Sequence, residues 1–376
     1  MMILPMLTVT GGCRQGPWTL WQSYAARFID NQGRVIDPTR GAISTSEGQS
    51  YAMFFALVAN DRSHFDRLLA WTQANLAQGD LSARLPGWLW GKAPDGTWHL
   101  LDPNPASDAD VWMAYSLVEA GRLWNTPSYT ALGRAMMRRI AATEVADLPG
   151  LGPMLLPGPT GFKQEHSWIL NPSYVPEFIF ERWAVIDPGG PWQHVALNLP
   201  RFLRQSAVHG WAMDWVQYVP GDGFYPAPPP VAAGQPVPPP VGSYDAIRVY
   251  LWAGLTDSGS ALRAEILSAV PAMGAYLAEH DAPPEKVSDH GIPMAQDGSV
   301  GFSAAVLPYL RALPNLAKSS SKQTIRLSRE RVASSGLYGK QVTYYDQNLA
   351  LFATGFTGGR FRFGSGGELR VEWARL

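Results

Sequence analysis

The chain has 376 residues, of which 46% are hydrophobic and 16% are charged, and these proportions exclude an intrinsically disordered protein. Thirty Lys and Arg residues against 31 Asp and Glu leave a formal net charge of −1, so no basic excess exists to attract nucleic acid. The single cysteine, Cys13, excludes an internal disulfide, a cysteine-based zinc site and an iron–sulfur cluster. The 15 tryptophans exceed what packing requires, and their flat, half-polar rings suit sugar faces as well as a tryptophan-rich core.

Residues 1–17 are predicted to be a leader or the remnant of an export signal. The opening MMILPMLTVTGGC is apolar but too short to cross a bilayer. It lacks the basic region that begins a secretory signal, although small residues follow its apolar stretch. No later window of about 18 residues is free of polar interruption, so we expect no stable membrane insertion.

Apolar residues recur at helical spacing along most of the chain and predict about eleven helices. The expected helices cover 18–30, 46–60, 63–78, 108–125, 127–145, 173–185, 192–208, 243–255, 258–280, 301–313 and 342–356. Alternating strand patterns are few, with one small hairpin expected over 360–371. The connections are rich in Gly and Pro and often carry Trp, as in LPGWLWGK at 85–92. Paired helices with long loops favour an all-α toroid over an irregular all-α domain.

Two segments depart from this order. Residues 226–240, PAPPPVAAGQPVPPP, predict a polyproline-like loop, and we expect an insertion rather than a domain linker because helical periodicity resumes directly afterwards. The stretch 318–331 is basic and serine-rich, and it is predicted to be a solvated, mobile face rather than a nucleic-acid site.

The motifs of several common chemistries are missing from the sequence. It contains no GxxxxGK(S/T) phosphate loop, no GxGxxG after a strand, no HExxH zinc motif and no GxSxG nucleophile motif. Its seven histidines are scattered, so we expect no metal and no cofactor. Carboxylate chemistry remains.

Acidic residues stand at the start of three predicted helices. The first is Glu47, where Ser44-x-x-Glu47 also fits a capping box that would give the glutamate a purely structural role. The second is the pair Asp108 and Asp110, which follow Ser107, itself a candidate cap.

The third is Asp245, which follows the candidate cap Ser243 and can pair with Arg248 at the i+3 position. A toroid of helix pairs places alternate helix starts at one end, so these acids can converge in one cleft. Glycoside hydrolysis needs such convergence, because one carboxylic acid protonates the leaving oxygen while a carboxylate activates water.

The stretch 106–124, ASDADVWMAYSLVEAGRLW, resembles the signature of glycoside hydrolase family 8 at every position. Other segments are similar to one branch of that family, the endoglucanases encoded with bacterial cellulose synthase. These segments are ISTSEGQSYAMFFALVANDR at 43–62, LPGWLWGK at 85–92, PGLGPMLLPG at 149–158, NPSYVPEF at 171–178 and SYDAIRVYLW at 243–252. The resemblance covers roughly residues 18–313.

The resemblance implies an (α/α)6 barrel over 18–376 as a single catalytic domain. It also implies an endo-acting β-1,4-glucanase, a cellulase that inverts the anomeric carbon. Its substrate would be β-1,4-glucan chains, and export to the periplasm or the medium would place it beside the cellulose synthase complex as a further partner. The expanded proline-rich loop before Asp245 departs from the family pattern.

The same resemblance implies the site. Glu47 corresponds to the general acid and Asp245 to the general base. One of Asp108 and Asp110 corresponds to the acid that holds the sugar at the cleavage subsite, and Asp108 is preferred over Asp110 for this role. Further substrate-binding candidates are Trp90, Trp168 and Tyr174 for stacking, Tyr244 for orienting water, and Arg248.

Two alternatives stay open. The chain is a hydrolase of a related β-glycan, namely mixed-linkage glucan, chitosan or xylan, or it is an accessory protein that only binds glucan. An acid/base pair argues against the second, since binding alone does not require one.

Overall fold

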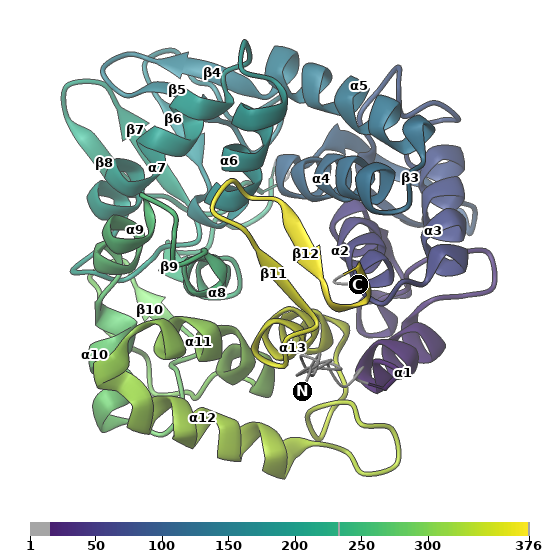
Figure 1. Cartoon of the computed structure of the whole chain (residues 1–376). Coiled ribbons are helices and arrows are strands. Elements are labelled where there is room, and N and C mark those ends of the chain that lie inside the picture. The colour runs from purple at the N-terminus through teal and green to yellow at the C-terminus, as the bar shows by residue number, and fades with distance from the viewer. Residues whose placement is uncertain (1–15, 232–233, 375–376) are drawn as a thin grey trace, which may run out of the picture.

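The computed structural model describes residues 16–231 and 234–374, so the predicted leader lies outside the described residues apart from its last two. The described chain forms thirteen α-helices joined by short strands and loops (Figure 1). The helices are α1 (Thr19–Phe28), α2 (Ser46–Val58), α3 (Arg62–Asn75), α4 (Ser107–Leu123), α5 (Pro127–Thr143), α6 (Glu177–Ile186), α7 (Trp192–Ser206), α8 (Ala246–Leu255), α9 (Arg263–Ala269), α10 (Ala272–Glu279), α11 (Val300–Ala312), α12 (Ala317–Glu330) and α13 (Tyr344–Thr357).

Small antiparallel sheets connect the helices. The strands are β1 (Ser44–Thr45), β2 (Gly87–Lys92), β3 (Trp98–Pro105), β4 (Val145–Leu148), β5 (Gly152–Leu155), β6 (Trp168–Leu170), β7 (Val216–Val219), β8 (Gly223–Pro226), β9 (Val241–Gly242), β10 (Val287–Ser288), β11 (Phe361–Phe363) and β12 (Leu369–Val371). They pair as β1-β2-β3, β6-β7-β8, β4-β5, β9-β10 and β11-β12, and the β11-β12 hairpin confirms the one expected from the sequence.

An inner ring of helices is surrounded by the remaining ones (Figure 1). The inner helices are α2, α4, α6, α8, α11 and α13; α2 packs on α4 and α13, and α11 packs on α8 and α13. This arrangement is the (α/α)6 barrel expected for the chain.

Composition explains which helices lie inside. A helix segment that is apolar on all sides must be buried on all sides, and the YAMFFALV part of α2 is of this kind. Every residue of α2 except Glu47 is buried. The one exception is therefore a carboxylate at the helix start, on an otherwise enclosed element.

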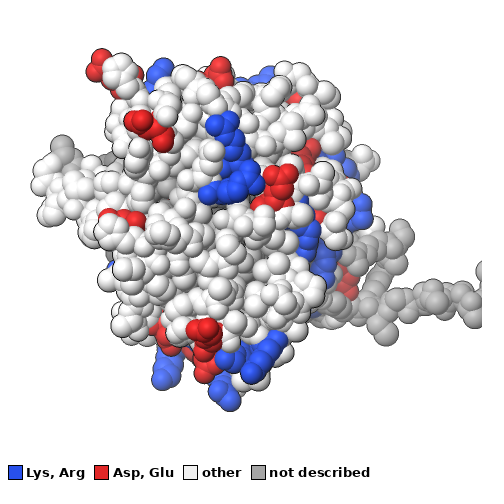
Figure 2. All heavy atoms as spheres, turned by 90° about the vertical axis from the view of Figure 1, so that its left-hand side faces the viewer, with Lys and Arg blue, Asp and Glu red and all other residues white. Residues whose placement is uncertain are grey.

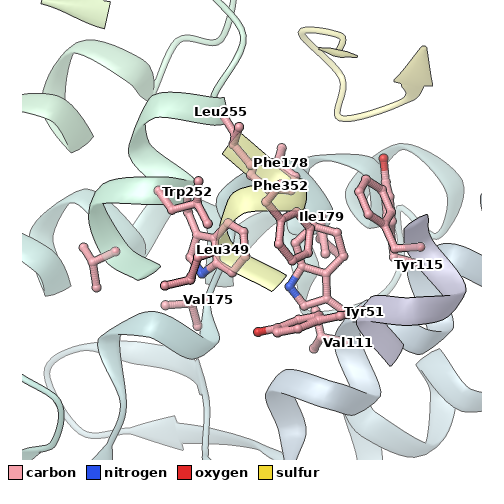
Figure 3. Close-up of a cluster of buried hydrophobic side chains, with 14 of the residues drawn as sticks. Tyr51, Val111, Tyr115, Val175, Phe178, Ile179, Trp252, Leu255, Leu349 and Phe352 are labelled. Atoms are coloured by element: carbon pink, nitrogen blue, oxygen red, sulfur yellow. The ribbon is translucent and has the colours of Figure 1, made fainter. Parts of the chain in front are cut away.

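The centre of the barrel is an aromatic cluster to which several inner helices contribute (Figure 3). The Trp112 ring lies 4.9 Å from the Phe352 ring and 5.2 Å from the Trp252 ring, measured between centroids. Trp21, Trp112, Trp183 and Trp192 are among the largest fully buried side chains, so for these the tryptophan-rich core is the correct interpretation.

The β11-β12 hairpin follows the C-terminal end of α13 and closes the barrel at that end. Its Phe363 ring stacks on Phe178 with 3.9 Å between centroids, and Tyr115 donates a hydrogen bond of 2.8 Å to the Gly367 carbonyl. Gly367 has φ +73, and a Cβ there would lie 1.8 Å from the Phe178 carbonyl oxygen, so only glycine fits. The opposite end, where α2, α4, α8 and α13 begin, stays open for a site.

Three expected elements differ from the structure. The helix predicted over 258–280 is two helices, because Pro271 interrupts it before α10. The segment 318–331, expected as a solvated face, is the amphipathic helix α12, which buries Leu327 and Gln323 against the barrel. The connection 85–92, expected as a loop, contains strand β2.

The proline-rich segment begins in strand β8 with Pro226, continues through the buried Ala227 and then forms a largely exposed loop over its described residues, up to β9. Its two ends are attached to adjacent residues: the Ala227 N–H donates to the Trp215 carbonyl (2.9 Å), and the Asp214 N–H donates to the Val241 carbonyl (2.9 Å). The ends of the loop therefore lie close together, and a short connection can join them.

We expect that replacing residues 228–239 with a short Gly/Ser connection leaves the fold intact. The free energy of unfolding should change by about 0.5–1 kcal/mol, because shortening an exposed loop alters mainly its closure entropy. Thermal unfolding followed by circular dichroism measures this. A loss of several kcal/mol would show that the segment packs into the barrel.

Candidate active site

Glu47 lies in the first turn of α2, and its side chain does not cap the helix. Thr45 is the N-cap, and its hydroxyl accepts the Gly48 N–H at 3.1 Å. The alternative role of Glu47 in a capping box with Ser44 is not observed, because the Ser44 hydroxyl donates to the Val35 carbonyl at 2.5 Å. The Glu47 carboxylate is thus available to the open end of the barrel.

Asp108 lies in the first turn of α4. The N-cap position is Ala106 without a side-chain bond, so the cap expected at Ser107 is not formed. One Asp108 carboxylate oxygen accepts its neighbour's backbone N–H, that of Ala109, at 2.7 Å. The side chain of Asp108 is only 5% exposed, which places it at the floor of the site.

Arg248 joins the three acids. Its Nη1 lies 3.0 Å from Glu47 Oε2, and its Nη2 lies 2.9 Å from Asp245 Oδ1 and 3.5 Å from Asp108 Oδ2. The i+3 pairing of Asp245 with Arg248 predicted from the sequence is confirmed. The guanidinium is 3% exposed and also donates to the hydroxyls of Ser173 and Tyr345 at 3.0 and 3.3 Å. One buried cation therefore holds three carboxylates from three inner helices at one point.

A cavity of about 750 Å³ opens above this cluster. The side chains of Glu47 and Asp245 are 21% and 24% exposed, so both reach the cavity while Arg248 stays beneath them. The wall includes the aromatic residues Trp88, Tyr174, Tyr244, Tyr344 and Tyr345. Carboxylates beside aromatic rings are the surfaces that a sugar chain requires.

The environment of Glu47 favours its protonated form. Burial raises the pKa of Glu47, and the charge of Asp245 adds to this, while Arg248 and a hydrogen bond from Asp108 act in the opposite direction. Burial together with the charge of Glu47 raises the pKa of Asp108 well above its ordinary value. Both shifts favour a protonated carboxyl at this pair.

Of the four aromatic residues predicted to bind substrate, two line the cavity and two do not. Tyr174 and Tyr244 line the cavity. Trp90 does not line it and instead stacks on Trp98, with the Arg34 guanidinium 4.3 Å from its ring centroid. Trp168 is buried against Tyr218 and is also absent from the cavity wall.

Asp110 is fully buried and lies outside the cavity, beside Glu144. Burial and the neighbouring Glu144 raise the pKa of Asp110, and burial raises the pKa of Glu144 to about 8. The two carboxyls form a separate pair beneath the site.

Sequence reasoning missed Trp88 and Tyr345, which line the cavity. It also missed Asp214, whose carboxylate accepts backbone N–H groups at the start of α8. Trp88 and Trp90 lie on the same strand, whose pairing with β3 contains register shifts, and only Trp88 of the two lines the cavity. Tyr345, at the start of α13, accepts a hydrogen bond of 3.3 Å from Arg248 and comes from the C-terminal part of the chain, beyond the recognised signature.

The charged residues on one face of the molecule, and the possible metal ligands among the described residues, show no second site. On the face shown in Figure 2, the acidic and basic residues that the structure describes are scattered among uncharged ones. Within the described ranges, no group of three or more His, Cys, Asp and Glu side chains is arranged to hold a metal ion. No helix among the described residues is long and apolar enough to cross a membrane.

A barrel of paired helices with three carboxylates at its open end is typical of a glycoside hydrolase. The model of the family described as glycosyl hydrolases family 8 matches residues 1–359, and the chain belongs to this family. An endoglucanase of Xanthomonas axonopodis is 43% identical over 376 residues, 99% of this chain and 93% of the relative.

Other relatives agree with this assignment. The endoglucanase of Escherichia coli K12 is 42% identical over 377 residues, 100% of this chain and 96% of the relative. The crystal structure of an endo-1,4-D-glucanase from Vibrio fischeri superposes with a TM-score of 0.84 at 37% identity, covering 95% of this chain and 100% of that one. The chain is an endoglucanase of family 8.

Proposed function

We propose that the protein hydrolyses internal β-1,4 bonds of glucan chains with inversion at the anomeric carbon. Glu47 is the general acid, Asp245 is the general base, and Asp108 holds the sugar at the cleavage subsite. The observation that carries this proposal is the convergence of all three carboxylates on Arg248 beneath one cavity.

The reaction follows from the two exposed carboxyls. Glu47 gives its proton to the glycosidic oxygen as the bond from that oxygen to the anomeric carbon breaks. Asp245 takes a proton from a water molecule, whose oxygen attacks the anomeric carbon from the opposite face. Solvent then restores the proton to Glu47 and removes the one on Asp245.

We expect the two carboxylates to have the spacing that this route needs. They contact different terminal nitrogens of one guanidinium, so they are held apart instead of touching each other. Inversion requires about 6.5–9.5 Å between the carboxyls, so that a water molecule fits between base and sugar. Arg248 therefore acts as the spacer.

The choice of β-1,4-glucan rests on the relatives named above as endoglucanases and on the aromatic wall of the cavity. The resemblance to the branch encoded with cellulose synthase extends the proposal to an exported enzyme that acts on nascent cellulose. Fractionation of cells that express the full chain tests the compartment.

We expect the first product released from cellohexaose to be the α-anomer. A single displacement by water inverts the β configuration, and proton NMR during the first turnovers distinguishes the two anomers. Initial release of the β-anomer would exclude the inverting mechanism. Parallel assays with mixed-linkage glucan, chitosan and xylan decide the substrate, and a faster rate on any of these would replace cellulose in the proposal.

A further inference from the structure

Asp214 binds the start of helix α8 from a different part of the chain. One of its carboxylate oxygens, Oδ1, accepts three backbone N–H groups, those of Ser243 at 2.7 Å, Asp245 at 3.1 Å and Ala246 at 2.7 Å. Asp214 precedes strand β7 and lies about thirty residues before these donors, so this contact is a tertiary one.

These N–H groups would otherwise lack partners. The first N–H groups of a helix have no carbonyl within the helix, and an aspartate at the N-cap ordinarily accepts one of them with its own side chain. Asp245 occupies the N-cap position of α8 but makes no such bond, because its carboxylate pairs with Arg248 and faces the cavity. The expected cap Ser243 does not serve either, since its hydroxyl donates to the Glu285 carbonyl at 2.7 Å.

We propose that Asp214 is a positioning residue for catalysis, which caps α8 in place of Asp245 and thereby frees the Asp245 carboxylate to act as the base. This inference rests on the proposed role of Asp245. Because Arg248 lies one turn further along α8, the same contact also sets the distance between Asp245 and the other two acids.

The backbone of Asp214 strengthens this attachment. Its N–H donates to the Val241 carbonyl at 2.9 Å, so backbone and side chain together hold the segment from Val241 to Ala246. This segment follows the exposed proline-rich loop directly. Asp214 therefore attaches the segment that carries Asp245 at the point where the loop ends.

For capping α8, the acceptor oxygen Oδ1 of Asp214 is more important than the negative charge of its carboxylate. Burial and the charge of Asp245 raise the pKa of Asp214 to about 7, while the N–H groups of Ala246 and Ser243 and the cation Arg248 act in the opposite direction. The neutral form is thus readily accessible. An asparagine, which keeps the Oδ1 acceptor in the same position, is a close substitute for it.

The test compares three variants of the full chain with wild type. Asp214→Asn keeps the acceptor oxygen and removes the charge, whereas Asp214→Glu keeps the charge and displaces the acceptor oxygen. Asp214→Ala removes both. We expect kcat on cellohexaose to stay within about tenfold for Asn and to fall by about 10²-fold for Glu and Ala, the cost of misplacing a reacting group by about 1 Å. KM should change little, because the sugar-binding wall is untouched.

Two results would overturn the inference: wild-type kcat in Asp214→Glu, or an equal loss of kcat in Asn and Glu. If Asp214→Ala does not fold, the comparison of Asn with Glu still decides, because both retain a polar side chain. Asp245→Asn is measured alongside them. Activity in that variant would refute the base itself, whereas inactivity of Asp245→Asn combined with an active Asp214→Glu would refute only the role of Asp214.

Discussion

Glu47→Gln is expected to lower kcat by at least about 10²–10⁴-fold, the usual contribution of general acid catalysis. The amide keeps the shape of the side chain and can still meet Arg248, which lies 3.0 Å from the carboxylate in the wild type. It has no proton to give to the leaving oxygen. Binding of cellohexaose, measured by calorimetry, should therefore survive while turnover is lost.

Glu177→Gln is the matched control for this change. Glu177 is a buried glutamate whose pKa is raised to about 8 by burial, and its carboxylate accepts a hydrogen bond from Thr256 outside the cavity. The same substitution there should leave kcat within a few fold. If Glu47→Gln retained more than about a tenth of wild-type kcat, Glu47 would not be the acid.

The pH dependence gives the same assignment a second test. Because burial and Asp245 raise the pKa of Glu47, the protonated acid persists above the pH at which a free glutamate ionises, and activity is lost as the pH rises through that pKa. The alkaline limb of kcat/KM against pH should therefore lie above the ordinary range of a glutamate. A limb at the ordinary value would contradict the desolvated environment of Glu47.

Asp108→Asn is expected to lower kcat by about 10²-fold or more, with little change in thermal stability. Asp108 lines the cavity and lies 3.5 Å from Arg248, where a carboxylate that grips a distorted sugar ring contributes mainly in the transition state. Steady-state kinetics combined with a melting curve separates this effect from unfolding.

Asp110→Asn makes the same chemical change two residues further along α4. Asp110 is fully buried beside Glu144 and away from the cavity, so kcat should stay within about tenfold. The free energy of unfolding should instead change by about 1–3 kcal/mol, as expected for a mismatched buried polar pair. An inactive, stable Asp110→Asn together with an active Asp108→Asn would reverse the two roles.

Much of the fold could be predicted from local pattern. The apolar spacing of α2, α4 and α13 identifies these as helices, because burial on the inside of a barrel demands apolar side chains at helical intervals. The prediction failed where the local pattern was ambiguous. The serine-rich α12 lacks a long apolar stripe, and the interruption at Pro271 lies inside a segment that otherwise reads as continuous helix.

By itself, the sequence determined the family of the chain and the candidate acids. Glu47, Asp108 and Asp245 stand at helix starts, and the stretch around Asp108 resembles the family signature. Only the tertiary structure decided which groups support them. Asp214 caps α8 from about thirty residues away, and Trp88 rather than Trp90 lines the cavity. Both outcomes depend on hydrogen bonds and strand register between separate segments, which side-chain periodicity within one segment does not encode.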